Sequence, residues 1–465
     1  MPSTRFIRFA AALLIIALPA CSSAGGGGGA GGNNPLNPAD SASVELVRAA
    51  AIPITGAQTD YESLMALIGD ARFVVLGEAT HGTQEFYHER ARITRRLIQE
   101  KGFAAMAIEG EWPDAQAVHR FVRGTGGPAT AEEGLRGFTS GFPEWMWANT
   151  AIRDLVVWMR EHNAGRPAEQ QVGFYGLDVY SWFESADSVV AYLSRVDPDA
   201  AGRARERYAC LRPHRQNPVA YGSIALRNAE RSCQDEAAEQ VAEMEQLYAA
   251  GGGDAHARDE RFSALQNARV VAGGEAYWRA QWEGGPASWN ARDRHMATTL
   301  EHLVDHLQAQ GRTPKVVVWA HNTHAGDARL TEMGQGGEWN VGQLMRQAFE
   351  GESVLVGFTT YHGAVLAAEE WDAPGRVRRL NPALPESFSA LFHRTGIPAF
   401  LLTFRGREEL SRAMGEPRLE RAVGVVYMPA TERQSHYFTA MLSRQFDAVI
   451  HVDSSTAVTP LPVRR

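Results

Sequence analysis

Short runs of apolar residues recur along the chain, separated by stretches in which apolar residues repeat every three or four positions. The runs are typical of buried strands, and the longer spacing is typical of amphipathic helices. The clearest runs cover residues 73–77, 103–109, 171–178, 315–320 and 354–360. Because helical stretches separate these strands, the pattern predicts parallel βαβ units and therefore an α/β protein.

The same periodicity places helices before and after the first strands. We expect them over residues 41–51, 61–68, 83–100, 113–121, 290–309 and 340–349, with a further helix that opens at 142–147 and ends near His162. The C-terminal part contains strand-like runs at 399–404, 423–428 and 448–452, and an amphipathic stretch at 432–446. The sequence contains no internal repeat and no second linker, so residues 41–465 are expected to form one domain.

One segment, about residues 196–280, differs in character from the rest of this domain. It is long, charged and rich in Ala, Glu and Arg, with few β-branched runs, and Gly251–Gly253 marks a turn within it. We predict a large helical insertion here, either a hairpin or a bundle. It contains Cys210 and Cys233, which in an oxidising compartment would be a natural disulfide pair. Two buried free thiols are the alternative.

The N-terminus has the features of an export signal. Arg5 and Arg8 precede an apolar run, residues 10–19, that is too short to span a bilayer securely. The run ends in Leu18-Pro19-Ala20-Cys21, which resembles the lipobox of bacterial lipoproteins. In that motif the cysteine is acylated and becomes the first residue of the mature chain.

We therefore predict a lipoprotein signal peptide over residues 1–20, a lipid-modified Cys21 and a Gly-rich tether over residues 21–40. The protein would then be exported and anchored by lipid to a membrane of the bacterial cell envelope. An ordinary signal peptide that is cleaved nearby is the alternative, with the cysteine incidental.

Composition and charge exclude one class of partner. The chain of 465 residues is 44% hydrophobic and 22% charged, which is ordinary for a globular protein. Its formal net charge is −8, and no block of Lys and Arg exceeds a few residues. A nucleic-acid surface requires a basic patch, so we expect no nucleic-acid partner.

Polar side chains with catalytic potential follow the predicted strands. In chain order they are Glu78 with His81, Glu109, Asp178, and His321 with His324. Right-handed crossovers would bring the carboxyl ends of parallel strands to the same rim, where ligands bind in open α/β sheets. The alternative for residues 73–82 is an ordinary βα turn whose Glu and His are solvated or capping.

Several catalytic classes lack their motifs. The chain has no Gly-x-Ser-x-Gly elbow, which disfavours a serine hydrolase of the α/β-hydrolase type. It also has no Gly-x-Gly-x-x-Gly after the first strand and no P-loop, so nucleotide use is unsupported. A metal-free site fits the residues present: His81 would be the general base on a water, oriented by Glu78 or Glu109, and Arg90 would face developing oxyanion charge.

A metal site is the competing interpretation of the same residues. The His321-x-x-His324 pair with nearby carboxylates could bind a divalent cation, although this spacing at a strand end is not a specific ligand signature. We predict no resident cofactor, and metal dependence stays an open alternative.

Several separated motifs, in matching order, resemble the erythromycin esterase family. They are Gly77-Glu-Ala-Thr-His-Gly82, Glu109, Phe174-Tyr-Gly-Leu-Asp178, Asn290-Ala-Arg-Asp293, Ala320-His-Asn-Thr-His324 and Gly357-Phe-Thr-Thr-Tyr-His-Gly363. The resemblance covers about residues 45–460. It implies a three-layer α/β/α core around a mainly parallel sheet with helical additions. It also implies ester hydrolysis by activated water without a serine nucleophile, best known for the macrolactone of macrolide antibiotics.

The resemblance also implies roles for individual residues. The catalytic set is His81, Glu78, Glu109, Arg90, His321 and His324, with His81 as the general base and Glu78 as its neighbouring acid. Arg292 matches an arginine upstream of the paired histidines, and we expect it to bind substrate together with Asp178. Trp147 is a further candidate for the substrate site, as are Trp145 and Trp282.

The sequence therefore predicts a membrane-anchored hydrolase that acts on a small-molecule ester. A macrolide lactone, and with it antibiotic resistance, is one option among environmental and envelope esters. Two alternatives stay open: a metallohydrolase that uses the same residues, and a non-catalytic envelope protein that binds a macrolide or a glycan. Fold-level kinship does not decide between substrates.

Overall fold

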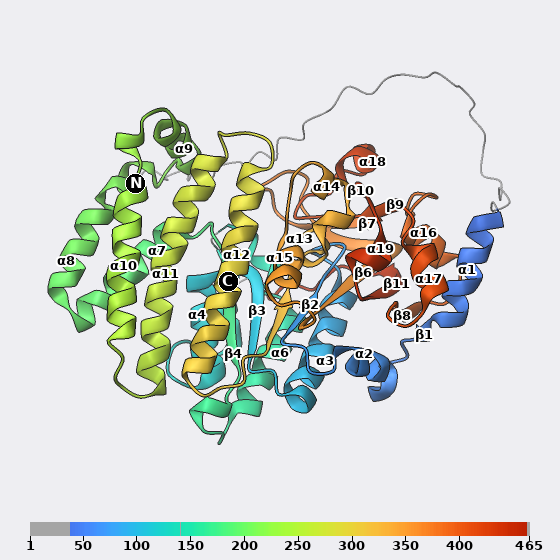
Figure 1. The fold of residues 1–465 in the computed structure, drawn as a ribbon, viewed down its shortest axis with the longest axis horizontal. Coiled ribbons are helices and arrows are strands. Elements are labelled where there is room, and N and C mark those ends of the chain that lie inside the picture. The colour runs from blue at the N-terminus through green and yellow to red at the C-terminus, as the bar shows by residue number, and fades with distance from the viewer. Residues whose placement is uncertain (1–37, 140, 463–465) are drawn as a thin grey trace.

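A mixed sheet of nine strands organises residues 38–139 and 141–462, which are the part of the chain that the computed structural model describes (Figure 1). The predicted signal peptide, the lipid-modified Cys21 and most of the predicted tether lie outside the described residues. Six strands run parallel in the order β11-β6-β2-β5-β3-β4. Their bounds are β2 Phe73–Leu76, β3 Ala105–Glu111, β4 Gly173–Asp178, β5 Val316–Trp319, β6 Ser353–Ala367 and β11 Ala448–Ser455.

Three antiparallel strands extend this parallel core. β8 (Ala399–Thr403) pairs with β11, β1 (Ile52–Pro53) pairs with β8, and β7 (Arg376–Leu380) pairs with the long strand β6. The prediction of an α/β protein with a mainly parallel sheet and a helical insertion is confirmed.

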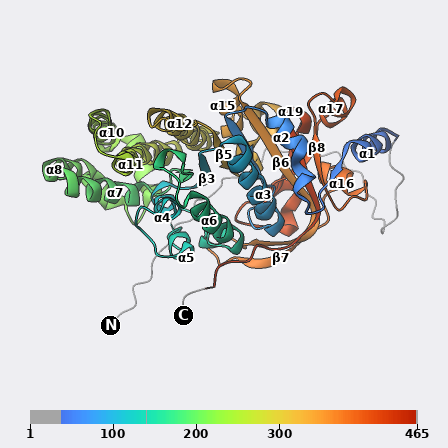
Figure 2. The same ribbon diagram turned by 90° about the horizontal axis from the view of Figure 1, so that it is seen from below.

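Side-chain alternation along the strands divides the core into two layers. In β2, Val74 and Leu76 pack on one face and Phe73 and Val75 on the other, and all four are fully buried. Helices cover both faces (Figure 2). One layer holds α2 (Glu62–Ile68), α3 (Gln84–Lys101), α4 (Trp112–Arg123) and α6 (Thr150–Asn163); the other holds α1 (Pro38–Ala50), α12 (Ala287–Ala309), α15 (Val341–Ala348), α16 (Phe388–His393) and α17 (Glu408–Met414).

The helical insertion has a hydrophobic core of its own. It consists of α8 (Pro198–Arg207), α9 (Pro218–Arg227), α10 (Gln234–Ala249) and α11 (Ala255–Ala280), seen in green and yellow in Figure 1. The preceding helix α7 (Trp182–Val196) packs into the same cluster through Trp182, Val189 and Leu193. The structure joins Cys210 and Cys233 by a disulfide with their Cα atoms 5.9 Å apart.

Two predicted elements differ from the structure. Residues 423–428 form no regular strand but two isolated bridges, Val423 with Thr80 and Val426 with Ala368. Both edges of β2 are already paired, with β5 and β6, so this apolar run lies along the loop after β2 instead. The helix expected from 142–147 begins only at Thr150, because the side chain of Asn149 caps it by accepting a hydrogen bond from the Ile152 N–H.

The amphipathic stretch at 432–446 is also divided. It folds as α18 (Glu432–Ser435), β10 (Tyr437–Ala440) and α19 (Leu442–Gln445), and β10 pairs with β9 (Arg418–Arg421). Tertiary pairing thus overrides the local spacing. Among the described residues, no helix combines the length and apolar character needed to cross a bilayer.

Candidate active site

The polar residues expected at strand ends meet at the carboxyl ends of four neighbouring strands. Glu78 and His81 follow β2, Glu109 lies near the end of β3, Asp178 ends β4, and His321 and His324 follow β5. β2, β5, β3 and β4 are consecutive in the sheet. All of these side chains are buried, which places the charges where water screens them little.

Close packing fixes the loop that carries Glu78 and His81. A Cβ at Gly77 would overlap the side chain of Asn322, and a Cβ at Gly82 would overlap the backbone of Leu366. The hydroxyl of Tyr87 donates a hydrogen bond of 2.8 Å to the His81 carbonyl, and the His81 N–H donates to the carbonyl of Val423 at 3.2 Å. The loop therefore has little freedom to move away from the sheet.

Glu78 bridges a histidine and an arginine. The Nδ1–H of His81 donates to its Oε1 at 2.8 Å, and Nη2 of Arg90 donates to its Oε2 at 2.5 Å. With Nδ1 protonated, the Nε2 of His81 carries the free lone pair that a general base requires.

Arg90 lies behind Glu78 and is fully buried. Its guanidinium stacks between Tyr87 and Trp319, 4.7 and 4.4 Å from the ring centroids. The sequence interpretation gave Arg90 an oxyanion to stabilise. The structure instead directs it at a carboxylate, where its hydrogen bond holds Glu78 in position.

A second network surrounds Arg292 of α12. Its Nε and Nη2 bind both oxygens of Asp178 at 2.8 and 2.6 Å, and Nη2 also donates to Glu109 at 2.8 Å. The faces of Phe142 and Tyr180 lie over the same guanidinium, at 5.4 and 5.2 Å. A fork of this kind holds two carboxylates from different strands in fixed positions.

His324 completes this network. Its Nδ1 lies 2.9 Å from both oxygens of Asp293, and its ring stacks on Trp289 with centroids 4.3 Å apart. Nε2 lies 2.8 Å from Nη1 of Arg292 and 3.5 Å from Oε1 of Glu109. Burial lowers the pKa of His324, but Asp293 and Glu109 more than offset it and raise the pKa above its ordinary value.

The Arg292 contact opposes this protonation, because Nε2 accepts that hydrogen bond only in the neutral ring. The carboxylates nevertheless dominate the local charge. Glu109 stays ionised: burial raises its pKa, but His324 and Arg292 lower it well below the ordinary value. Of the histidines at this rim, His324 is the one best placed to hold a second proton.

His321 has the opposite environment. Burial and the neighbouring His81 hold its pKa well below the ordinary value, although Glu109 and the nearby Ala79 backbone pull the other way. Its Nδ1 accepts from the N–H of Thr323 at 3.4 Å, which leaves the proton of the neutral ring on Nε2. Nε2 has no well-aligned hydrogen-bond partner among the described residues.

The rings of His81 and His321 lie next to each other. Their centroids are 4.9 Å apart, and the backbone N–H of His321 donates to Oε2 of Glu109 at 2.7 Å. A ring with a free lone pair and a ring with an N–H thus lie side by side, on the loops that follow two strands. In this arrangement His81 can accept a proton from a reacting group. His321 can donate a hydrogen bond to a neighbouring atom that gains negative charge.

Asn322 connects the two loops. Its N–H donates to the Glu78 carbonyl at 2.8 Å, and its side-chain amide donates to the Phe358 carbonyl at 2.8 Å and to Glu420 at 2.9 Å. Burial raises the pKa of Glu420 to about 8, despite its hydrogen bonds with Asn322 and Gln445. At pH 7 an uncharged carboxyl group, that of Glu420, therefore binds the residue that connects the two loops.

Other parts of the site were not predicted from the sequence. They are Asp293, Trp289, Phe142, Tyr180, Asn322, Glu420 and a second buried carboxyl, Glu111. Burial and the charge of Asp178 raise the pKa of Glu111 well above its ordinary value. Two signals were present: the Asn290-Ala-Arg-Asp293 motif contains Asp293, and the Ala320-His-Asn-Thr-His324 motif contains Asn322.

Two of the tryptophans selected as substrate walls, Trp147 and Trp282, contact other parts of the protein. Trp147 is buried in the core between Tyr87 and Phe138, with 1% of its surface exposed. Trp282 is half exposed on the insertion, where its indole N–H donates to the Val219 carbonyl at 2.8 Å. Phe142 and Tyr180 are the aromatic residues that face Arg292.

The described residues contain no group of three or more His, Cys, Asp or Glu side chains arranged to hold a metal ion. Nδ1 of His81 and Nδ1 of His324 are each turned toward a carboxylate. Those nitrogens are therefore engaged in hydrogen bonds and do not converge on a common point.

Fold and site together define a mixed α/β protein whose candidate chemistry rests on histidines and carboxylates at strand ends. A sequence profile of the erythromycin esterase family matches residues 98–455, more than half of the chain. The chain belongs to this family and is a hydrolase of its kind, with a small-molecule substrate. The matched region includes Glu109, Arg292 and the β5 histidines, and begins after the loop of Glu78 and His81.

Two curated proteins are similar along most of their length. Erythromycin esterase type II from Escherichia coli is 22% identical over 412 residues, which covers 85% of this chain and 93% of that protein. The putative hydrolase YbfO from Bacillus subtilis (strain 168) is 20% identical over 419 residues, covering 85% and 86%.

Solved structures share the fold. A Bacillus cereus protein is 20% identical with a TM-score of 0.76, covering 92% of this chain and all of that one. A succinoglycan biosynthesis protein is 19% identical with a TM-score of 0.73, covering 90% and 98%. A mutant of the erythromycin esterase EreC in its open conformation is 16% identical with a TM-score of 0.56, covering 85% and 94%.

Proposed function

We propose that this protein is an ester hydrolase in which His81 activates water without a serine nucleophile and without a metal ion. The observation that carries the proposal is the Glu78 bridge, which holds His81 on one side and Arg90 on the other. The bridge fixes the tautomer of His81 and leaves Nε2 as the base, beside the ring of His321.

In the proposed reaction, Nε2 of His81 takes a proton from water, and the resulting hydroxide attacks the ester carbonyl. The carbonyl π electrons move to oxygen, and the Nε2–H of His321 donates to the oxyanion of the tetrahedral intermediate. Collapse of the intermediate breaks the bond to the alcohol oxygen, which is protonated by His324 or by the His81 imidazolium. The products are a carboxylic acid and an alcohol, with one water consumed.

The substrate is proposed to be a small-molecule ester, and a macrolide lactone is one member of that class. Support comes from the similarity to erythromycin esterase type II, whose name states its substrate. An identity of 22% leaves the substrate of this chain to experiment. The aromatic faces of Phe142 and Tyr180 would suit a substrate with a large apolar body.

The test is a panel of macrolides and simple esters incubated with the purified protein. Mass spectrometry should detect a ring opened by one water, or an acid and an alcohol. Activity should survive thorough chelation and fall by roughly 10²–10⁴ in His81→Ala. The exposed His88→Ala, on the same helix–loop unit, is the matched control and should retain activity. Hydrolysis that is lost on chelation and restored by a divalent cation would reject the metal-free mechanism.

We also propose that Cys21 is lipid-modified and holds the protein at the cell envelope. The support is the sequence Leu18-Pro19-Ala20-Cys21 after a short apolar run. In the bacterial cell the wild-type chain should fractionate with membranes and yield an acylated N-terminal peptide. Cys21→Ser should become soluble; a Cys21→Ser chain that stays in the membrane fraction would contradict the anchor.

A further inference from the structure

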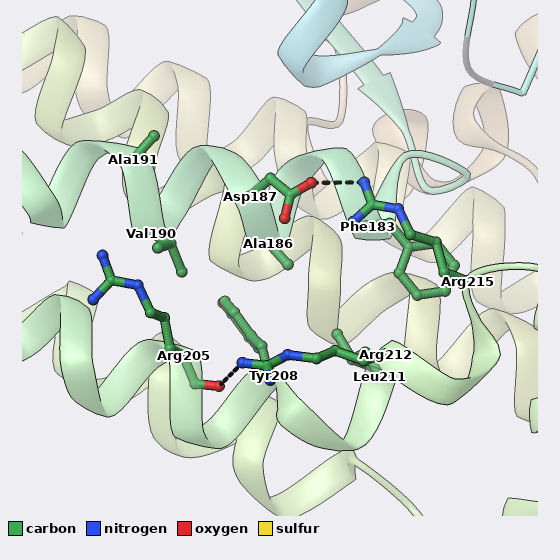
Figure 3. Close-up of a pocket in the computed structure, with 10 residues that line it drawn as sticks. All are labelled: Phe183, Ala186, Asp187, Val190, Ala191, Arg205, Tyr208, Leu211, Arg212 and Arg215. Atoms are coloured by element: carbon green, nitrogen blue, oxygen red, sulfur yellow. Dashed lines mark hydrogen bonds and ion pairs between the residues drawn. The ribbon is translucent and has the colours of Figure 1, made fainter.

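A solvent-facing hollow of about 390 Å³ lies between α7 and the helical insertion (Figure 3), and none of the rim residues lines it. One wall is α7, and the other is formed by α8 and the 3₁₀ helix Tyr208–His214 that follows it. Its floor is apolar, made by Phe183, Ala186, Val190, Tyr208 and Leu211. The volume is at the lower end of the range for small-molecule sites.

Three arginines border this apolar floor: Arg205, Arg212 and Arg215. In Figure 3, Arg205 and Arg215 lie toward opposite ends of the hollow, with Tyr208 between them. Arg215 is paired with Asp187 at 2.6 Å. The other two bind only neutral oxygens: Arg205 donates to the Ser194 hydroxyl at 2.8 Å, and Arg212 donates to the Arg205 carbonyl at 3.2 Å.

Neighbouring arginines on the insertion show that this lack of acidic partners is local. On α8, Arg203 and Arg207 face α10, and both form ion pairs with Glu243. Within the described residues, no carboxylate lies within ion-pair distance of Arg205 or Arg212, although the chain as a whole carries a net charge of −8. Two guanidinium groups are therefore left to bind an anion over an apolar floor.

The wall that carries these groups is held in place. Cys210, in the 3₁₀ helix between Tyr208 and Leu211, forms the disulfide with Cys233 directly before α10. Tyr208 is buried, and its hydroxyl has no hydrogen-bond partner among the described residues. A site that is rigid before binding loses less entropy when a ligand enters.

We propose that this hollow binds a small amphipathic anion: a carboxylate or phosphate ester whose head contacts Arg205 and Arg212 and whose short apolar chain or ring lies on Phe183, Val190 and Leu211. The head could belong to a free acid or to an anionic lipid, and the shared chemistry is an oxyanion attached to an apolar body. The proposal does not depend on the hydrolase mechanism, because none of these residues belongs to the rim.

The test uses the exported chain carrying Cys21→Ser, so that no acyl group of its own competes. Isothermal titration calorimetry would compare octyl phosphate and octanoate with inorganic phosphate and 1-octanol, which each supply only half of the recognition. The two amphiphiles should bind saturably, and each half-probe should bind at least about tenfold more weakly. The proposal would be overturned if neither amphiphile bound saturably and phosphatidylglycerol vesicles also showed no specific binding.

Variants assign the binding to this hollow. Arg205→Ser with Arg212→Ser removes the two arginines without acidic partners, and Val190→Trp fills the apolar part; each should weaken binding about tenfold or more. Arg258→Ser, an exposed arginine on α11 outside the hollow, is the control and should bind as the parent chain does. Unchanged affinity in both hollow variants, with circular dichroism showing that they are folded, would contradict the assignment.

A vesicle arm identifies the source of the anion. Co-sedimentation with phosphatidylglycerol vesicles but not with phosphatidylcholine vesicles, lost in the double arginine variant, would support the proposal with a lipid headgroup as the ligand. Binding of the free amphiphiles with no vesicle binding would support it with a soluble acid. Vesicle binding that is equal in the parent and in both hollow variants would count against the site.

Discussion

The two halves of the rim hold their histidines in opposite electrostatic settings. On the β2 side, His81 forms a hydrogen bond with one carboxylate, Glu78, and shares it with the buried Arg90. On the β3–β4–β5 side, three carboxylates from different elements surround one arginine and His324; they are Glu109, Asp178 and Asp293. In the first half one carboxylate faces one arginine, whereas in the second half three carboxylates are grouped around one arginine.

This difference supports the proposed roles of the histidines. A general base must start with a free lone pair, and the hydrogen bond from Nδ1 of His81 to Glu78 leaves that lone pair on Nε2. A general acid must start protonated, which is the state that two adjacent carboxylates favour in His324. His321 lies between the halves as a neutral N–H donor. Pairs of groups with divergent environments are the usual mark of divided acid and base roles.

The largest effect should come from removing the base. His81→Asn should lower kcat/KM on a confirmed ester by roughly 10²–10⁴, because the proton transfer to water loses its acceptor. Steady-state kinetics with the same ester measures this. Circular dichroism and the melting temperature of the variant should stay near those of the parent, and equal losses in His81→Asn and the exposed His88→Ala would break the assignment.

The second half should be more sensitive in its stability. Arg292→Met leaves Asp178 and Glu109 buried without their cation, which is expected to cost about 3–5 kcal/mol of unfolding free energy. Urea unfolding monitored by tryptophan fluorescence would measure it. Arg294→Met, exposed on the same helix, should lie within about 0.5 kcal/mol of the parent. If both variants unfold at the same urea concentration, the network contributes no stability.

Glu420, beneath the junction of the two halves, should make stability depend on pH. Its pKa is raised by burial from 4.5 to about 8, so the folded state binds the proton more tightly than the unfolded state does. Its contribution is therefore full below about pH 4.5 and is lost as pH rises toward 8, with a slope near 1.4 kcal/mol per unit at most.

Glu420→Gln keeps the hydrogen bond with Asn322 but has no proton to lose. Its unfolding free energy should therefore vary less than that of the parent between pH 5 and 8, measured by urea titration at several pH values. Identical slopes for the two proteins would mean that Glu420 is ionised in the folded state.

A smaller effect is expected when a carboxylate next to His324, that of Asp293, is removed. Asp293→Asn should lower the pKa of His324, because Asp293 is the group that raises it most. His324 would then stay protonated over a narrower pH range. The decline of kcat at high pH should therefore begin at lower pH, with kcat about tenfold lower than that of the parent at the highest pH of the profile. Rate profiles across pH measure this shift; a limb that moves to higher pH would contradict the role of Asp293.

The parts of the site that could be predicted from sequence are those fixed by local pattern. Glu78, His81, Asp178 and the β5 histidines each stand where an apolar run ends, and a parallel sheet brings such ends together. The Glu78–His81 pair is also local, three residues apart. Hydrophobic periodicity was therefore enough to predict the β2 half of the site. It also predicted the edge of the sheet at which the other half lies.

The remaining parts depend on contacts between distant residues. Glu420 reaches Asn322 across 98 positions and Arg292 reaches Glu109 across 183, and no local pattern reports such pairs. The direction of Arg90 was missed for a related reason: a helical spacing gives the face of a residue but not which of several charges it meets. Similarly, Trp147 was selected for its type, while the fold buries it in the core.

The central claim, that His81 directs water itself onto the ester, is tested most directly by a single turnover in H₂¹⁸O with enzyme in excess over a confirmed ester. Direct attack predicts one ¹⁸O in the carboxylic acid product of the parent, no ¹⁸O in the protein, and product formation slowed by roughly 10²–10⁴ in His81→Asn. Appearance of ¹⁸O in a peptide containing Glu78 or Glu109, with unlabelled acid released in the first turnover, would show a carboxylate nucleophile and contradict the account.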